Sequence, residues 1–156
     1  MIRPATVDDV PVILAMIREL AEYERAPDAV EATEDHLRSS LFGASPAVFA
    51  HIAEQDGEPV GFALWFLNYS TWQGVHGIYL EDLYVRPHAR GQGHGRALLS
   101  TLARICIDRG YGRLQWWVLD WNESAIAFYH SLDAIPMDEW TVHRVSGEAL
   151  AALAAG

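Results

Sequence analysis

The spacing of apolar positions predicts two helices in the first part of the chain. Between residues 10 and 21 apolar side chains recur every three or four residues, which is typical of an amphipathic helix. Thr6 and Asp9 stand just before this segment at the spacing of a capping box, which marks a helix start. A second, short helix is expected over residues 34–41, so the chain opens with two helices.

The middle of the chain has the pattern of strands. Residues 47–53 and 60–67 are rich in apolar residues and flank a polar turn at 54–58, which predicts an antiparallel hairpin. A loop at 68–77 is expected to lead into residues 77–85. That segment is apolar except for two adjacent acids, so it is expected to form a central strand.

The second half adds further helices and strands. A long helix is expected to end at Gly110, followed by a buried strand over 114–119 and a helix from Asn122 to about Leu132. Short strands are expected near 134–136 and 140–145, before an alanine-rich helical end. No linker or repeat interrupts the pattern, so residues 1–156 are interpreted as one α+β domain.

Composition indicates where in the cell the protein works. No apolar run approaches the roughly 20 residues of a membrane span, and the first residues lack the apolar region of a secretory signal. The single cysteine, Cys106, cannot form an internal disulfide, and it lies on an apolar helix face as inert packing. We therefore expect a cytoplasmic protein that neither spans nor binds a membrane.

The distribution of charge indicates what the chain can bind. Its net charge of −10 argues against nucleic acid as a partner. Residues 1–60 carry twelve acids against four arginines, whereas residues 86–113 carry six arginines and a single acid. An acidic first part beside a basic centre suits a cationic substrate and an anionic cofactor. The chain contains no lysine, which excludes chemistry that depends on a lysine side chain.

A glycine-rich turn separates the central strand from the long helix. In VRPHARGQGHGRALL, residues 85–99, Gly91, Gly93 and Gly95 alternate with other residues, and Arg90 and Arg96 flank them. Bare backbone at a helix N-terminus suits a phosphate group, because several N–H groups converge there and the helix dipole adds positive potential. The alternative is a tight strand–helix connection in which glycine only permits a positive φ.

The spacing of the turn selects among phosphate-binding motifs. It fits neither the dinucleotide fingerprint nor the P-loop. Arg90, Gly93 and Gly95 match R-x-x-G-x-G, which resembles the pyrophosphate loop of the GNAT (GCN5-related) N-acetyltransferases. W-N-E-S-A-I-A-F-Y at 121–129 resembles the second GNAT signature. I-R-P-A-T, R-E-L-A-E-Y-E and Y-L-E-D, at residues 2–6, 18–24 and 79–82, are similar to the diamine (spermidine/spermine) and thialysine acetyltransferase branch.

The resemblance implies a fold and an activity. The fold would be a mixed, mostly antiparallel central sheet of six to seven strands flanked by about four helices. The activity would be acetyl transfer from acetyl-CoA to a primary amine of a small cationic acceptor, a polyamine, diamine or lysine-like molecule, by direct attack in a ternary complex. The branch also implies a homodimer that pairs through C-terminal strands.

The resemblance also implies which residues bind the cofactor. Leu83 and Val85 would pair with the pantetheine arm like an added strand, and the turn would hold the pyrophosphate. Asn122 would touch the pantetheine, although capping its own helix is an equal alternative. The full predicted set is Leu83, Tyr84, Val85, Arg90, Gly91, Gln92, Gly93, His94, Gly95, Arg96 and Asn122.

Two residues match the catalytic positions of the branch. Tyr129 would be the acid that returns a proton to the leaving thiolate, and Glu81 would draw the substrate's proton through water. A partly buried aromatic with a polar tip is the alternative for Tyr129. Strand alternation predicts that Glu81 and Asp82 lie on opposite faces. A salt bridge to an arginine is the alternative for either acid.

The acceptor site is predicted to comprise Tyr23, Glu24, Trp72 and Asp82, because carboxylates and aromatic faces suit an alkylammonium chain. For Glu24, an exposed glutamate at a helix end is the alternative. The histidines match no metal-ligand spacing, so no metal is expected. Asp133 stands where the family usually has a glycine, and aspartate tolerates the left-handed conformation better than most residues.

Two other functions remain open at this point. One is acetylation of a lysine or N-terminal amine in a protein, for which an acidic surface would suit a basic peptide. The other is a CoA-binding module without catalysis.

Overall fold

The computed structural model describes all residues from Met1 to Gly156. The chain divides into two compact units, Met1–Trp117 and Val118–Gly156, and each is described by itself.

A five-stranded sheet forms the centre of the first unit. Its strands are β1 (Ile2–Pro4), β2 (Phe49–Gln55), β3 (Glu58–Ser70), β4 (Val75–Val85) and β5 (Leu114–Gln115), in the spatial order β1-β2-β3-β4-β5. The first four strands are antiparallel to their neighbours, and β5 is parallel to β4. The predicted meander is therefore confirmed, and the loop between β3 and β4 is shorter than expected.

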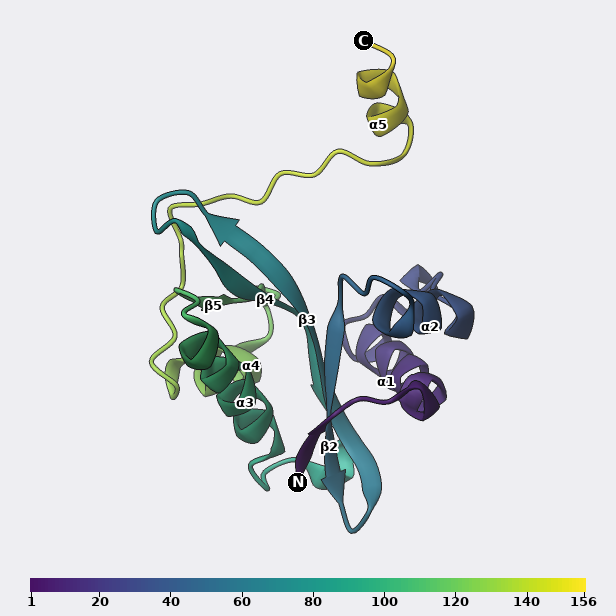
Figure 1. Ribbon diagram of the computed structural model, residues 1–156, viewed down its shortest axis with the longest axis vertical. Helices are drawn as coiled ribbons and strands as arrows, with labels where there is room; N and C mark the ends of the chain where they lie inside the picture. The colour runs from purple at the N-terminus through teal and green to yellow at the C-terminus, as the bar shows by residue number, and fades with distance from the viewer. The chain divides into compact units, whose positions relative to one another are not determined.

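Helices cover both faces of this sheet (Figure 1). The helices α1 (Val10–Tyr23) and α2 (Glu34–Phe42) lie on one face, and α3 (His94–Arg109) lies on the other. Three short 3-10 turns link these elements: η1 (Val7–Asp9), η2 (Pro27–Ala29) and η3 (Pro87–Ala89). The predicted capping box is present, because the Asp9 carboxylate accepts hydrogen bonds from the backbone N–H and the hydroxyl of Thr6.

The main core lies between the sheet and the first two helices. Ile13 and Met16 of α1 and Ile52 and Phe62 of the sheet have no exposed surface. The helical residues are three apart and face the sheet together, as the period of the apolar pattern requires. Each such side chain contributes roughly 1.5–3 kcal/mol by leaving water, so this layer fixes α1 against the sheet.

A β-bulge interrupts the pairing of β3 with β4. Leu64 pairs with Asp82 and Trp65 pairs with Leu80, so Glu81 is an extra residue without a partner. The regular alternation on which the prediction for Glu81 and Asp82 was based fails here, because Leu80 and Asp82, two residues apart, lie on opposite faces. Asp82 shares its face with Leu64, whose side chain belongs to the core beneath α1.

The second unit contains α4 (Glu123–His130) and α5 (Gly147–Ala154) and no strand. The Asn122 side chain accepts a hydrogen bond from the Ala125 N–H, so the predicted cap is present. Asp133 has a φ of 61°, the left-handed conformation that its place after the helix requires.

The predicted α+β class is confirmed, with five strands instead of six to seven and five α-helices instead of about four. The strands predicted at 134–136 and 140–145 are absent, and β5 ends at Gln115 instead of Leu119. A strand forms only where a neighbouring backbone accepts and donates its hydrogen bonds. These segments have no such neighbour within the chain.

Candidate functional site

The edge strand β5 parts from its neighbour β4 where the predicted site begins. Only two pairs join β4 to β5, Ile78 with Leu114 and Tyr79 with Gln115. From Leu80 to Val85, β4 is paired with β3 on one side and with no strand on the other. The backbone groups on that open edge, which include the predicted Leu83–Val85 segment, can pair with an extended ligand in the way an added strand does.

The glycine turn presents a run of amides without acceptors. None of the backbone N–H groups from Gly91 to Arg96 donates to another group of the chain. Gly91 and Gly93 have φ values of 75° and 87°, the left-handed region that favours glycine. No side chain caps the start of α3. We call residues 91–96 the amide turn; its unpaired N–H groups and the positive end of the α3 dipole form an anion site.

The side chains around the amide turn point to other partners. The Arg90 Nε donates to the Val85 carbonyl over 2.8 Å, and its guanidinium lies 5.3 Å from the centre of the Tyr23 ring and 5.6 Å from that of Tyr84. His94 Nε2 lies 3.1 Å from the Gln55 side-chain oxygen. The amide turn therefore offers an anion mainly its backbone. Arg90 instead connects the end of β4 to the end of α1.

An ion pair holds α1 against the end of β4. The guanidinium of Arg86 donates two hydrogen bonds to the Glu19 carboxylate, over 2.9 and 3.2 Å, and a third to the Pro59 carbonyl. A two-pronged arginine–carboxylate pair fixes orientation as well as distance. Tyr23 and Glu24, at the end of the same helix, are thereby held near β4.

Three carboxyl groups meet at the bulge, namely Glu24, Glu81 and Asp82, which we call the acid cluster. Burial, and then the negative charges of Glu81 and Glu24, raise the pKa of Asp82 to about 7. Burial also raises the pKa of Glu24. No member of the acid cluster forms an ion pair, and the Asp82 carboxyl has no hydrogen-bond partner within the chain. The predicted acceptor acids are thus brought together.

Aromatic rings that the sequence analysis missed lie beside the acid cluster. The Tyr79 ring packs against Phe66, with centroids 5.0 Å apart, and edge-on against Trp117 at 5.7 Å. Burial, followed by the charges of Glu81 and Asp82, raises the pKa of Tyr79 to about 12. The sequence signal that could have identified Tyr79 as a site residue is its position two residues before Glu81 in the same strand. Aromatic faces next to carboxylates suit an alkylammonium group.

Three predicted residues lie away from the acid cluster or in the other unit. Trp72 is 90% exposed at the tip of the β3–β4 hairpin. Asp82 lies seven positions after Val75 in β4, or about 20 Å at the rise of a strand, so Trp72 does not line the acid cluster within its own chain. Asn122 and Tyr129 belong to the second unit, in which Tyr129 lies one residue before the end of α4.

The surroundings of Cys106 do not favour a nucleophilic thiol. Cys106 is buried in α3 and its Sγ lies 3.7 Å from the Arg113 carbonyl, and burial raises the pKa of its thiol. A protonated, buried thiol is a poor nucleophile. No group of three or more His, Cys, Asp or Glu side chains is arranged to hold a metal ion. No helix is both long enough and apolar enough to cross a bilayer.

Comparison with known proteins points in the same direction as this geometry. The family model of the acetyltransferase (GNAT) family matches residues 13–133. The thialysine N-epsilon-acetyltransferase of Bos taurus is 42% identical over 165 residues, covering 99% of this chain and 96% of that protein. The L-ornithine N5-acetyltransferase NATA1 of Arabidopsis thaliana is 31% identical over 197 residues, covering 97% of this chain and 86% of that protein.

A solved structure has the same fold. An integron cassette protein from the mobile metagenome of V. cholerae superimposes with a TM-score of 0.83 at 28% identity, covering 100% of this chain and 98% of that chain.

The shared charge of the acid cluster gives the first prediction. In carbon-13 NMR of the protein labelled at aspartate, the Asp82 carboxyl should titrate near pH 7. Glu81→Gln should lower that pKa, because it removes a neighbouring negative charge, yet burial should keep it above the usual value for aspartate. Glu58→Gln, the same change at an exposed site, should leave it unaltered. Titration of Asp82 near pH 4 in the wild type would contradict the assignment.

Proposed function

This chain belongs to the GNAT acetyltransferase family and acetylates amines, and on that basis we propose that its acceptor is the primary amine of a small polycation, lysine-like, diamine or polyamine. The acid cluster is the observation that carries the proposal. Three carboxyl groups without an ion-pair partner leave a negative potential that one further cation neutralises. The names of the relatives, thialysine and ornithine acetyltransferases, support an acceptor of this size and charge.

The donor of the family is acetyl-CoA, which supplies an acyl group activated as a thioester. The amide turn fits its pyrophosphate, because the unpaired N–H groups of residues 91–96 require anionic acceptors. Leu83, Tyr84 and Val85 on the open edge of β4 suit the amides of its pantetheine arm. Arg90 and Arg96 add positive charge at this end, and Asn122 is the proposed contact from the second unit.

The chemistry requires a proton to leave the ammonium group and another to reach the leaving sulfur. We assign removal of the ammonium proton to Glu81, acting through water. Asp82, Glu24 and Tyr23 hold the cationic acceptor. Trp72 lies too far from the acid cluster within its own chain, so its proposed contact with the acceptor would have to come from the second copy of the homodimer proposed below. Tyr129 holds a phenolic proton for the departing thiolate. The amine attacks directly, since the buried Cys106 is unsuited to carry the acyl group.

The pH dependence follows from Asp82. Its carboxyl is half protonated near pH 7 and becomes a carboxylate as the pH rises. A cation binds the carboxylate form more tightly, so kcat/KM should rise between pH 6 and pH 8.

A thiol-release assay tests the proposed acceptor. With acetyl-CoA and a panel of thialysine, lysine, putrescine, spermidine, an aminoglycoside and a basic peptide, the small polycations should release CoA thiol fastest. Neutral amines of the same size should have KM values higher by about tenfold or more, because they do not pair with the acid cluster.

The other two functions give different results in the same assay. A preference for the basic peptide would indicate a protein acetyltransferase. Absence of thiol release with every amine, from a protein that still binds CoA, would indicate a binding module.

Tyr129→Phe separates catalysis from cofactor binding. The change removes one hydroxyl, so turnover should fall about 100-fold while the Kd for CoA stays the same. Tyr111→Phe, a similar change at a partly buried tyrosine of the first unit, is the matched control and should keep full activity. Turnover of Tyr129→Phe within twofold of the wild type would remove Tyr129 from the mechanism.

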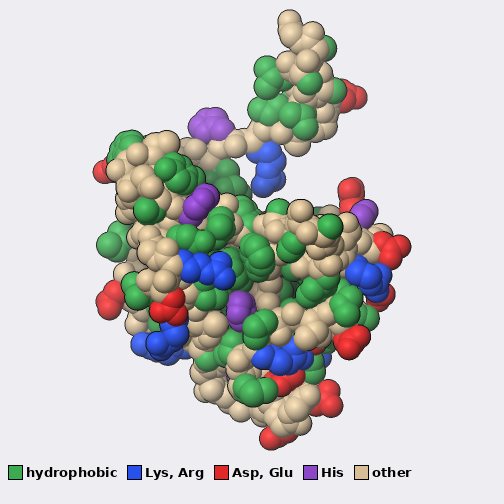
Figure 2. Space-filling view, in the orientation of Figure 1, with side chains coloured by type: hydrophobic (Ala, Val, Ile, Leu, Met, Phe, Trp, Pro, Cys, Tyr) green, Lys and Arg blue, Asp and Glu red, His purple; other side chains and the backbone are tan.

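We further propose that the protein is a cytoplasmic homodimer with no nucleic-acid or membrane partner. Hydrophobic side chains gather on α5 (Figure 2), and Leu150 and Leu153 are mostly exposed. The extended segment before α5 also exposes large apolar residues: Ile135, Met137, Trp140, Val142 and Val145. A second copy that covered this segment would bury its apolar surface and supply partners for its backbone.

Light scattering after size exclusion tests the dimer. The wild type should have twice the mass of the chain, and Trp140→Glu with Val142→Glu should shift it to the monomer, because charges oppose burial. Glu139→Gln beside them should leave the dimer intact. A monomeric wild type at micromolar concentration would contradict the proposal.

A further inference from the structure

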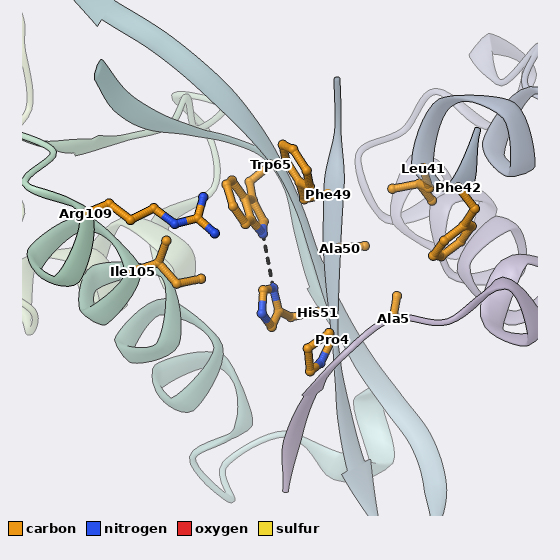
Figure 3. A pocket seen from close by; sticks show the side chains of 10 residues that line it. All are labelled: Pro4, Ala5, Leu41, Phe42, Phe49, Ala50, His51, Trp65, Ile105 and Arg109. Atoms are coloured by element: carbon orange, nitrogen blue, oxygen red, sulfur yellow. Dashed lines mark hydrogen bonds between the residues drawn. The ribbon is translucent and has the colours of Figure 1, made fainter. Parts of the chain in front are cut away.

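A pocket lies at the edge of the sheet that β1 forms, opposite the edge formed by β5. It encloses about 250 Å³ and is walled on one side by the end of α2 and on the other by α3 (Figure 3). β1 stops at Pro4, and after the hydrogen bond from the Ala5 N–H to the Ala50 carbonyl the start of β2 is paired with β3 alone and is open on the side of β1. The lining is largely apolar, with Leu41, Phe42, Phe49 and Ile105, and includes the polar residues His51, Trp65 and Arg109.

This pocket is separate from the acid cluster. Trp65 follows Leu64 in β3, so the two side chains lie on opposite faces of the sheet, and Asp82 shares the face of Leu64. Trp65 and Arg109 therefore meet on the α3 face. Figure 3 shows Arg109 extending from α3 toward Trp65, with His51 beside the indole.

His51 presents a hydrogen-bond donor to the pocket. Its Nδ1 accepts a hydrogen bond from the Trp65 indole Nε1 over 3.1 Å, which places the imidazole proton on Nε2. Burial, and then the charge of Arg109, lower the pKa of His51, so the ring stays neutral. Among buried polar side-chain atoms only Asn68 Oδ1 lacks a partner, so the unpartnered Nε2 of His51 is open to the pocket.

Arg109 brings a positive charge that nothing in the chain neutralises. The ion pairs of the protein involve Arg3, Arg38 and Arg86, and no carboxylate lies within reach of the Arg109 guanidinium. Arg109 also lies in the last turn of α3, where the helix dipole favours a cation. A free guanidinium next to an N–H donor forms a site for one anionic group.

From this arrangement we propose that the pocket binds a small aromatic monocarboxylate. The carboxylate accepts hydrogen bonds from Arg109 and from His51 Nε2, and the ring lies on the same face of the sheet, against Phe49 and Ile105. The volume is below the range of drug-sized sites, which suits a ligand of about ten non-hydrogen atoms. One arginine and one neutral donor match a single negative charge, whereas a phosphate dianion or a dicarboxylate would keep charge unpaired against apolar side chains.

Phenylacetate is the probe for this site. The protein is first saturated with CoA, so that the amide turn is occupied, and phenylacetate is then titrated while nitrogen-15 NMR follows the Trp65 indole N–H and the His51 ring. Saturable shifts of both groups are expected, and phenylacetamide, which lacks the charge, should bind at least about tenfold more weakly. Inorganic phosphate should shift neither group.

Two arginine variants on α3 distinguish binding in this pocket from non-specific attraction of an anion to positive charge. Arg109→Gln should weaken phenylacetate binding about tenfold or more, while Arg104→Gln, the same change at an exposed arginine of α3 that does not line the pocket, should have no effect. Thermal unfolding of both variants checks that the fold is intact.

Three results would overturn the proposal. These are the absence of shifts at 10 mM phenylacetate, equal binding by both variants, and shifts that occur only in a parallel titration without CoA. Shifts at the pocket that depend on protein concentration alone would show that a second copy fills it, and would also reject the ligand.

Discussion

The β-bulge at Glu81 is the feature on which the proposed acceptor site depends. Regular pairing of β4 with β3 would place Glu81 and Asp82 on opposite faces, and one acid would point toward α3. The extra residue changes the alternation, so Asp82 joins Tyr79 on the face beneath α1. At the bulge, burial and then the negative charges of Glu81 and Glu24 raise the pKa of Asp82 to about 7. In the proposed function, a bound cationic acceptor offsets this cost.

The same strand carries the other half of the site. Beyond Tyr79, β4 loses its contact with β5, and its open edge runs toward the amide turn at the start of α3. A negative region for the amine and a positive region for the cofactor thus lie along one strand. The ion pair between Glu19 and Arg86 keeps α1 fixed across its end, which holds Glu24 near Asp82. The proposed acceptor and cofactor sites therefore adjoin on β4, where Asp82 is followed directly by Leu83–Val85.

Local patterns predicted much of this structure. The apolar periods located α1, α2 and the meander, and the turn motif located the start of α3. The aspartate at the usual glycine position was expected to adopt a positive φ, and Asp133 does so. These features depend on residues close together in the chain, where conformational preference and spacing decide the outcome.

Features that depend on pairing between distant segments were not predictable. The bulge is invisible in β4 alone, since the register is set against β3. Tyr79 and Trp117 meet only because β5 lies parallel to β4. The pocket with Arg109 combines residues from different elements, β2, β3 and α3, and none carries a local motif. The prediction of strands at 134–136 and 140–145 was wrong for the same reason, because a segment with strand propensity forms a strand only beside a partner backbone.

Proton release on amine binding tests the central claim that the acid cluster at the bulge receives the cationic acceptor. Thialysine is titrated into the CoA-saturated protein at pH 7 by calorimetry in two buffers that differ in ionisation enthalpy. Because Asp82 is half protonated at this pH, binding should release roughly half a proton, and the heat should differ between the buffers accordingly. Asp82→Asn should abolish that difference. Equal heats in both buffers for the wild-type protein would contradict the account.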